Sequence, residues 1–235
     1  MKKIALLLFC TILVMSSFST VFADSAVEVE LEDSGNVWNK FLLIVDDIED
    51  ITVINKFGKD VDNDIADNVK RNLKLKNYDE VFNLLERHSL LLSYGVEENV
   101  LTSNGVEGNV LARNIDEEVN RTEYIYHLEY DKSETFKKEW LTIMKVRYTE
   151  NMNGTLTALG NPKITIEANF GGSFSIDTGN ISSGYKSKDN GRAIEFYGSY
   201  TLKAKLIYPV TVGGFEFETG RTFDWGTIYP RYTQR

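Results

Sequence analysis

The chain has 235 residues and a net charge of −9 at pH 7, with 35 acidic and 26 basic side chains. Its one cysteine, Cys10, lies near the start, so the rest of the chain has no thiol for a disulfide, a thiol nucleophile or a thiolate metal site. Residues 24–131 carry 25 acidic and 10 basic side chains, which argues against nucleic acid as a partner, because phosphates bind clustered Lys and Arg.

The first 23 residues have the pattern of a secretory signal peptide. Lys2 and Lys3 precede an apolar run at 4–14, and Val21 and Ala23 are suited to the small pockets of signal peptidase. The apolar run is too short to span a bilayer stably, although an uncleaved N-terminal anchor is the alternative. We expect cleavage after Ala23 and a secreted, extracellular chain without a stable membrane anchor. Frequent Lys, Asn and Ile with three prolines are typical of an AT-rich bacterial genome.

A flexible acidic start is expected at 24–35, followed by a helical region at 36–95. Apolar residues at 37–57 mostly follow the spacing of a buried helical stripe, although the β-branched run at 51–54 weakens the helix at its end. A second helix is expected where three apolar side chains recur at four-residue spacing, namely Ile65, Val69 and Leu73.

The third helix is expected from Tyr78 to Ser93, with Asn77 as its N-cap and Gly95 as its stop. A linker should follow at 96–119. It contains a decapeptide near-repeat, in which VEENVL at 96–101 is echoed by VEGNVL at 106–111. Two copies are too few for a solenoid, so the repeat is either a paired ligand loop or a local duplication in a tolerant linker.

From residue 120 onward the apolar residues alternate with a period of two, which predicts β-strands as far as residue 235. The longest alternation covers 194–208, where Gly198 suggests a bulge or kink. Gly213 and Gly214 predict a two-residue hairpin. The expected fold class is α+β, with N-terminal short helices followed by an antiparallel all-β sandwich, or partly open barrel, of about seven strands.

The acidic sequence DVDND at 60–64 resembles the opening of a calcium-binding helix–loop–helix. The match fails later, because Ile65 occupies the glycine position of that loop and Arg71 occupies its glutamate position. These acids are therefore expected at the start of the second helix, where their negative charge interacts favourably with the N-terminal end of the helix dipole. Calcium could bind here only if another acid from the fold completed the ligands, so no metal site is predicted.

The two histidines, His88 and His127, belong to no zinc-protease pair, and the chain has no Gly-x-Ser-x-Gly elbow. A Ser-His-Asp triad could still assemble in space, and two carboxylates could serve glycoside hydrolysis. The glycine-rich stretches at 171–172 and 179–184 lack the Lys-Ser or Lys-Thr of a phosphate loop, so no cofactor is predicted. Residues 172–191 could form an exposed hairpin or, alternatively, the inserting hairpin of a pore-forming toxin.

Aromatic side chains concentrate in the last fifty residues, where exposed rings could stack on sugars or anchor a protein partner. Tyr197, from its strand parity, and Tyr232, from its place near the terminus, are the predicted binding residues. The leading hypothesis is a secreted, non-enzymatic binding module for a protein or a glycan, with no predicted catalytic residue. The alternatives are a secreted cell-wall hydrolase that uses carboxylates and, third, a membrane-acting toxin-type factor.

Overall fold

The computed structural model describes residues 37–100, 117–130, 137–170, 174–206, 208–212 and 215–235. The predicted signal peptide, the predicted acidic start and most of the near-repeat lie outside these residues. Helices in the described part are α2 (Val37–Ile44), α3 (Asn63–Lys74) and α4 (Tyr78–His88), with 3-10 turns η1 (Ile48–Asp50) and η2 (Asp189–Gly191). Within the described residues, no helix combines the length and the apolar character that crossing a membrane requires.

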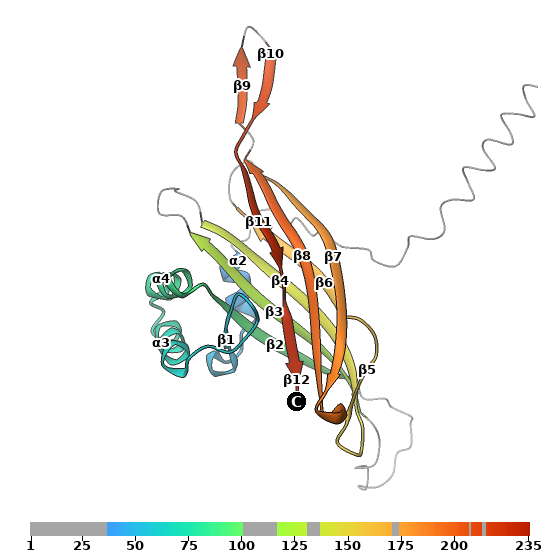
Figure 1. The fold of residues 1–235 in the computed structure, drawn as a ribbon. Coiled ribbons are helices and arrows are strands. Elements are labelled where there is room, and N and C mark those ends of the chain that lie inside the picture. Colours follow the sequence, from blue (N-terminus) through green and yellow to red (C-terminus); the bar gives the residue numbers. More distant parts are fainter. Residues whose placement is uncertain (1–36, 101–116, 131–136, 171–173, 207, 213–214) are drawn as a thin grey trace, which may run out of the picture.

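Twelve strands occur in the described residues, all paired in antiparallel fashion (Figure 1). Sheet A has the order β1-β2-β3-β4-β5, with β6 also on β4. Its strands are β1 (Thr52–Asn55), β2 (Leu90–Val100), β3 (Glu117–Tyr130), β4 (Lys137–Glu150), β5 (Leu156–Ala158) and β6 (Lys163–Asn169).

Sheet B is built around one long strand, β8 (Ala193–Leu206), which pairs on one side with β7 (Phe174–Lys188). On its other side β8 pairs with β11 (Thr222–Ile228) and then with β12 (Arg231–Gln234). A separate two-stranded ribbon, β9 (Tyr208–Val212) and β10 (Phe215–Thr219), projects beyond the sheet in Figure 1. Val212 pairs with Phe215, which confirms the predicted two-residue hairpin.

The molecule has three layers, because sheet A is covered by helices on one face and by sheet B on the other. One core joins the helices to sheet A, with Trp38, Phe41 and Leu85 among its buried residues. A second core lies between the two sheets and contains Phe196 and Tyr200. Together these layers confirm the predicted α+β class with a β-sandwich, although there are more strands than the seven expected.

Strand β4 shows how the central sheet serves both cores. Leu141 and Ile143 belong to the core against the helices, whereas Trp140 and Met144 belong to the core between the sheets. Successive side chains of a strand point to opposite faces, so β4 must be apolar on both. The sequence predicted half-buried strands, and β4 is instead buried on both faces along most of its middle.

The first predicted helix is shorter than the sequence suggested. The apolar stretch at 37–57 divides into α2, η1 and β1, and the β-branched run at 51–54 supplies most of β1. Asp62 caps α3 by accepting a hydrogen bond from the Asp64 backbone N–H at 2.9 Å. The acids therefore begin the second helix, as predicted.

The predicted helix from Tyr78 to Ser93 was wrong at its end. Helix α4 stops at His88 because Ser89 adopts the left-handed conformation, with φ 51° and ψ 52°. Leu90 then begins β2, whose strand continues through Gly95 and into the predicted linker as far as Val100. Asn77 precedes α4 as predicted, but its side chain makes no capping hydrogen bond. Its amide instead donates to Asn72 Oδ1 at 3.2 Å.

The prediction of turns or an exposed hairpin at 172–191 was also wrong, since residues 174–188 form the 15-residue strand β7 and the turn η2 is confined to residues 189–191. The irregularity expected at Gly198 lies on the neighbouring strand, where the pairing shifts register between Gly179 and Ser182. Gly198 has a different role. A Cβ atom there would lie 2.0 Å from Ile164 Cδ1 of sheet A, so the glycine permits close packing of the two sheets.

Candidate functional site

Two cavities flank a contact between the turn after β1 and the last strands of the chain. Asn55 Oδ1 organises this turn by accepting hydrogen bonds from the backbone N–H groups of Phe57 (2.9 Å) and Lys59 (3.2 Å). Gly58 has φ +69°, and a Cβ atom at this position would lie 3.1 Å from Cβ of Arg231. The turn therefore contacts β12 and links the edge of sheet A to the edge of sheet B.

The first cavity, which we call the aromatic cleft, has a volume of about 530 Å³ and lies between the end of α4, sheet A and β11. Its aromatic lining comes from Phe57, Trp140, Trp225 and Tyr229, together with the imidazole of His127. Aliphatic side chains complete it, namely Leu85, Leu90, Leu91, Leu128 and Ile228. Phe57 and Tyr229 are 56% and 49% exposed, so they form its rim.

The floor of the aromatic cleft is held by stacked rings. His127, which is 3% exposed, stacks on Trp140 with ring centroids 4.7 Å apart and an angle of 9° between the planes. Trp140 in turn contacts Trp225 of β11 at 5.7 Å between centroids. Since Trp225 also packs on Phe170 at 5.1 Å, rings from both sheets fix the shape of the floor.

Behind the floor, His127 begins a chain of buried hydrogen bonds. Its Nε2 lies 2.9 Å from Thr142 Oγ1, which lies 2.6 Å from Tyr200 Oη. The indole N–H of Trp140 donates to the same Tyr200 oxygen at 2.9 Å. Burial lowers the pKa of His127 to about 3 and raises the pKa of Tyr200 above its ordinary value. His127 is therefore neutral at neutral pH and is too weakly basic to serve as an efficient general base there.

The second cavity, which we call the charged seam, has a volume of about 490 Å³ and lies on the other side of the turn. Its lining is mainly polar and includes the cations Lys59, Arg121, Lys188 and Arg231, the acids Asp60, Glu123 and Glu195, and the ring of Tyr232. The predicted binding residue Tyr232 thus lies in a cavity. The sequence predicted that Tyr232 is exposed to solvent, whereas its side chain is half-buried.

Arg121 fills the middle of the charged seam. Its guanidinium lies 4.6 Å from the ring centroid of Tyr232 and is paired with Glu97 at 2.6 Å and with Glu123 at 3.1 Å. Ser93 Oγ donates a further hydrogen bond to the buried Glu123 at 2.6 Å. The ion pairs and the hydrogen bond lie within sheet A, and the contact of Arg121 with the Tyr232 ring connects them to sheet B.

The carboxylates of the charged seam bear on the hydrolase alternative. Lys188 and Arg231 hold the pKa of Glu195 below its ordinary value, despite partial burial, so this group stays ionised at neutral pH. Glu123 is buried and accepts hydrogen bonds from Arg121 and Ser93. Glycoside hydrolysis needs one carboxyl group with a raised pKa as proton donor, and the environment of Glu195 does not produce one.

Gly95 provides the space that Arg121 occupies, since a Cβ atom there would lie 2.0 Å from the Arg121 guanidinium. We expect Gly95→Ala to lower the free energy of unfolding by about 1–3 kcal/mol, the usual cost of overpacking. Urea unfolding of Gly95→Ala, Arg121→Ala and the double variant measures this. The cost of the alanine should largely disappear when Arg121 is absent, whereas additive costs would show that the two positions do not interact.

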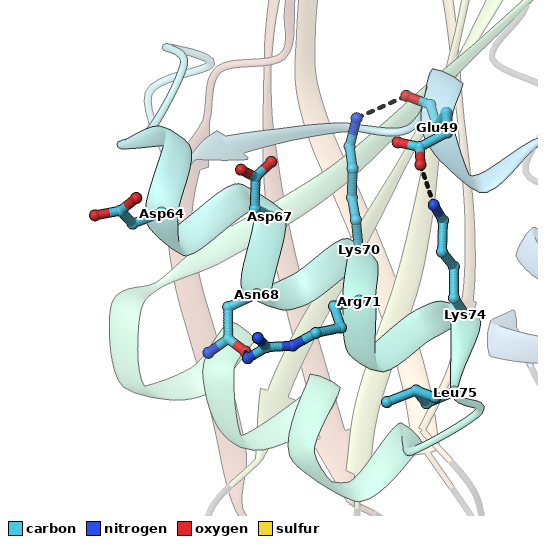
Figure 2. A pocket seen from close by; sticks show the side chains of 8 residues that line it. All are labelled: Glu49, Asp64, Asp67, Asn68, Lys70, Arg71, Lys74 and Leu75. Carbon is cyan, nitrogen blue, oxygen red and sulfur yellow. Dashed lines mark hydrogen bonds and ion pairs between the residues drawn. The ribbon is translucent and has the colours of Figure 1, made fainter.

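A third concavity runs along α3 and includes Asp64, the last acid of the calcium-like sequence at 60–64. Lys74 pairs with Glu49, and Lys70 Nζ donates to the Glu49 backbone oxygen at 2.6 Å (Figure 2). Asp64 and Asp67 point away from each other in Figure 2. Among the described residues no group of three or more His, Cys, Asp or Glu side chains could hold a metal ion. This surface is thus an ion-paired helix face.

Tyr197, the other predicted binding residue, lies apart from both cavities. It is 42% exposed on β8, as its strand parity predicted, and it lies over Gly184, where a Cβ atom would come within 2.7 Å of its hydroxyl oxygen. His88 is exposed at the end of α4 and is not near His127 in either cavity lining. The structure therefore brings neither Tyr197 with Tyr232 nor the two histidines into one site.

The sequence did not single out Phe57, Trp140 or Tyr229 for the aromatic cleft. Strand parity did place His127 on the face opposite Tyr126 and Leu128. In comparisons with protein-family models, with curated proteins and with solved structures, the chain matches none.

Proposed function

We propose that the chain is a secreted binding module that accepts an apolar side chain of a protein partner in the aromatic cleft. The observation that carries this proposal is the cleft itself, whose rings and aliphatic side chains come from both sheets and from the helical layer. Its volume of about 530 Å³ falls in the range typical of ligand sites, which are mostly apolar with a few polar groups.

The lining favours a protein side chain over a sugar as the occupant. Leucine and isoleucine side chains make up much of the wall, and they cannot form hydrogen bonds with the hydroxyl groups of a glycan. Burying such hydroxyl groups without partners costs free energy, whereas an aliphatic or aromatic side chain gains from the same surface. The cleft is also lined by charged residues of both signs, namely Lys56, Glu86 and Glu129. Protein interfaces typically surround a buried apolar side chain with such a polar rim.

Selection of random peptides displayed on phage against the full-length protein tests this proposal. The enriched peptides should share an aromatic or aliphatic residue. Their affinity should fall at least tenfold in Phe57→Ala and in Tyr229→Ala, because anchor contacts dominate binding energy. Both side chains are about half exposed, so their removal should leave the fold intact.

The matched control is Tyr185→Ala, since Tyr185 is 44% exposed on β7 and does not line the cleft. It should leave peptide affinity unchanged. Tyr197→Ala tests the binding residue predicted from the sequence, and a loss confined to that variant would move the site to the face of sheet B. Peptides that bind Phe57→Ala and Tyr229→Ala as well as the unmodified protein would contradict the proposal, as would binding to a glycan array alone.

A further inference from the structure

The hydrogen-bond chain behind the aromatic cleft has a direction that the chemistry of its members fixes. The indole N–H of Trp140 can only donate, so Tyr200 Oη accepts from it. The Tyr200 hydroxyl hydrogen then needs an acceptor, and Thr142 Oγ1 at 2.6 Å supplies one. The Thr142 hydroxyl hydrogen is in turn directed to the next atom of the chain, Nε2 of His127 at 2.9 Å.

The opposite direction leaves a buried donor without a partner. If His127 Nε2 carried the hydrogen, Thr142 would accept from it and donate to Tyr200. Tyr200 would then accept two hydrogen bonds, and its own hydroxyl hydrogen would have no acceptor among the described residues. Because Tyr200 is fully buried, an unused donor there would cost free energy. The direction from Trp140 to His127 gives a partner to the indole N–H, to both hydroxyl hydrogens and to Nε2 of His127.

The tautomer of His127 follows from this direction. Nε2 acts as the acceptor, so the hydrogen of the neutral ring is on Nδ1. Within the described residues, Nδ1 has no hydrogen-bond partner, and it is not among the fully enclosed side-chain atoms that lack one. The ring lines the aromatic cleft, whereas Thr142 and Tyr200 do not. Nδ1–H is thus available at the floor of a cavity whose walls are mainly aromatic and aliphatic.

We infer that His127 is a specificity-determining residue whose Nδ1–H donates a hydrogen bond to a carbonyl oxygen of the bound peptide, next to the apolar side chain in the cleft. This inference rests on the proposed function and names the chemistry of its ligand. Thr142 and Tyr200 are positioning residues, because they hold the hydrogen on Nδ1 without lining the cleft, whereas Trp140 both lines the cleft and donates to Tyr200. A ligand that buries only apolar atoms against His127 would leave this donor unsatisfied.

The tautomer can be measured without any ligand. A long-range ¹H–¹⁵N correlation spectrum of the full-length protein at neutral pH distinguishes the ring nitrogen that carries hydrogen from the bare one, and His127→Gln assigns the signals against those of His88. The Nδ1–H form should dominate. Tyr200→Phe should yield a mixture of both tautomers, because Thr142 then no longer receives a hydrogen bond from the phenol. A dominant Nε2–H form in the unmodified protein would overturn the inference.

Binding of two small probes tests the donor itself. N-acetyl-L-phenylalaninamide carries an aromatic side chain with carbonyl groups, and toluene carries the same ring without them. The unmodified protein should prefer the amide by about tenfold in NMR titrations, and His127→Phe should abolish that preference while still binding toluene. His127→Gln, which keeps a side-chain N–H, gives a second variant if the phenylalanine disturbs the fold.

The outcomes separate the two proposals. If both probes bind the unmodified protein equally, the role of His127 is wrong, whereas the aromatic cleft stands as an apolar site. If neither probe shifts the signals of the cleft, the proposed function fails at this cavity and the ligand role of His127 fails with it.

Discussion

The free energy of unfolding should fall steeply as the pH is lowered from about 6.5 toward 3, and His127 should cause much of that fall. Burial lowers the pKa of the folded-state imidazole to about 3, whereas the unfolded chain has the ordinary value of about 6.5. Between these two values the unfolded state binds one more proton than the folded state. The free energy of unfolding therefore falls by about 1.4 kcal/mol for each unit by which the pH is lowered, compared with a chain that has no titratable group at position 127.

Urea unfolding across this pH range, for the unmodified protein and for His127→Gln, checks the expectation. The variant cannot titrate, so its stability should fall less steeply, and the difference between the two slopes isolates the imidazole from the carboxylates. His88→Gln removes the other histidine, which is exposed, and should retain the steep slope. Equal slopes for the unmodified protein and His127→Gln would show that the ring at 127 is accessible to protons in the native state.

Cavities made in either core should destabilise one cooperative unit. Phe41 lies in the core between helices and sheet A, Phe196 lies in the core between the sheets, and both are fully buried. Because both rings are fully buried, Phe41→Ala and Phe196→Ala should each lower the free energy of unfolding by about 3–5 kcal/mol. Because strand β4 supplies side chains to both cores, each variant should still unfold in a single transition.

Unfolding followed by far-UV and near-UV circular dichroism tests this expectation, since the curves from the two probes coincide for a single unit. Leu43→Ala is the control, because Leu43 is 86% exposed on α2 and its loss should change stability by no more than about 0.5 kcal/mol. Separate transitions for the two cavity variants would support the division predicted from the sequence, with a helical region at 36–95 distinct from a β domain at 120–235.

The fold class could be predicted because periodicity is a local property. The alternation at 194–208 marked most of β8, and the acids before Ile65 marked the start of α3. The end of α4 could not be predicted, because Leu85 and Leu92 continue a helical spacing while Ser89 gives no local signal of its left-handed conformation. Only the first residues of strand β7, at 174–176, could be predicted, since the glycines, serines and asparagines that follow are typical of turns and only pairing with β8 makes them a strand.

The candidate site was far less predictable than the fold. Parity placed His127 on one face of its strand, but nothing local to it indicates Thr142, Tyr200 or Trp140 as neighbours. The aromatic cleft combines Phe57 with Tyr229, which meet because an early turn packs against the last strands. A single sequence shows which side of a strand is apolar, and it does not show which sheet edges approach each other.

The packing of Gly58 against Arg231 joins an early segment of the chain to its last strand. Both cavities take part of their walls from residues 52–60 and part from residues beyond 224. A ribosome or a translocation channel releases the early segment long before the late one, and such distant pairings form slowly because of the entropy of loop closure. Both cavities are therefore completed late in the synthesis of the chain, only when its final strands dock.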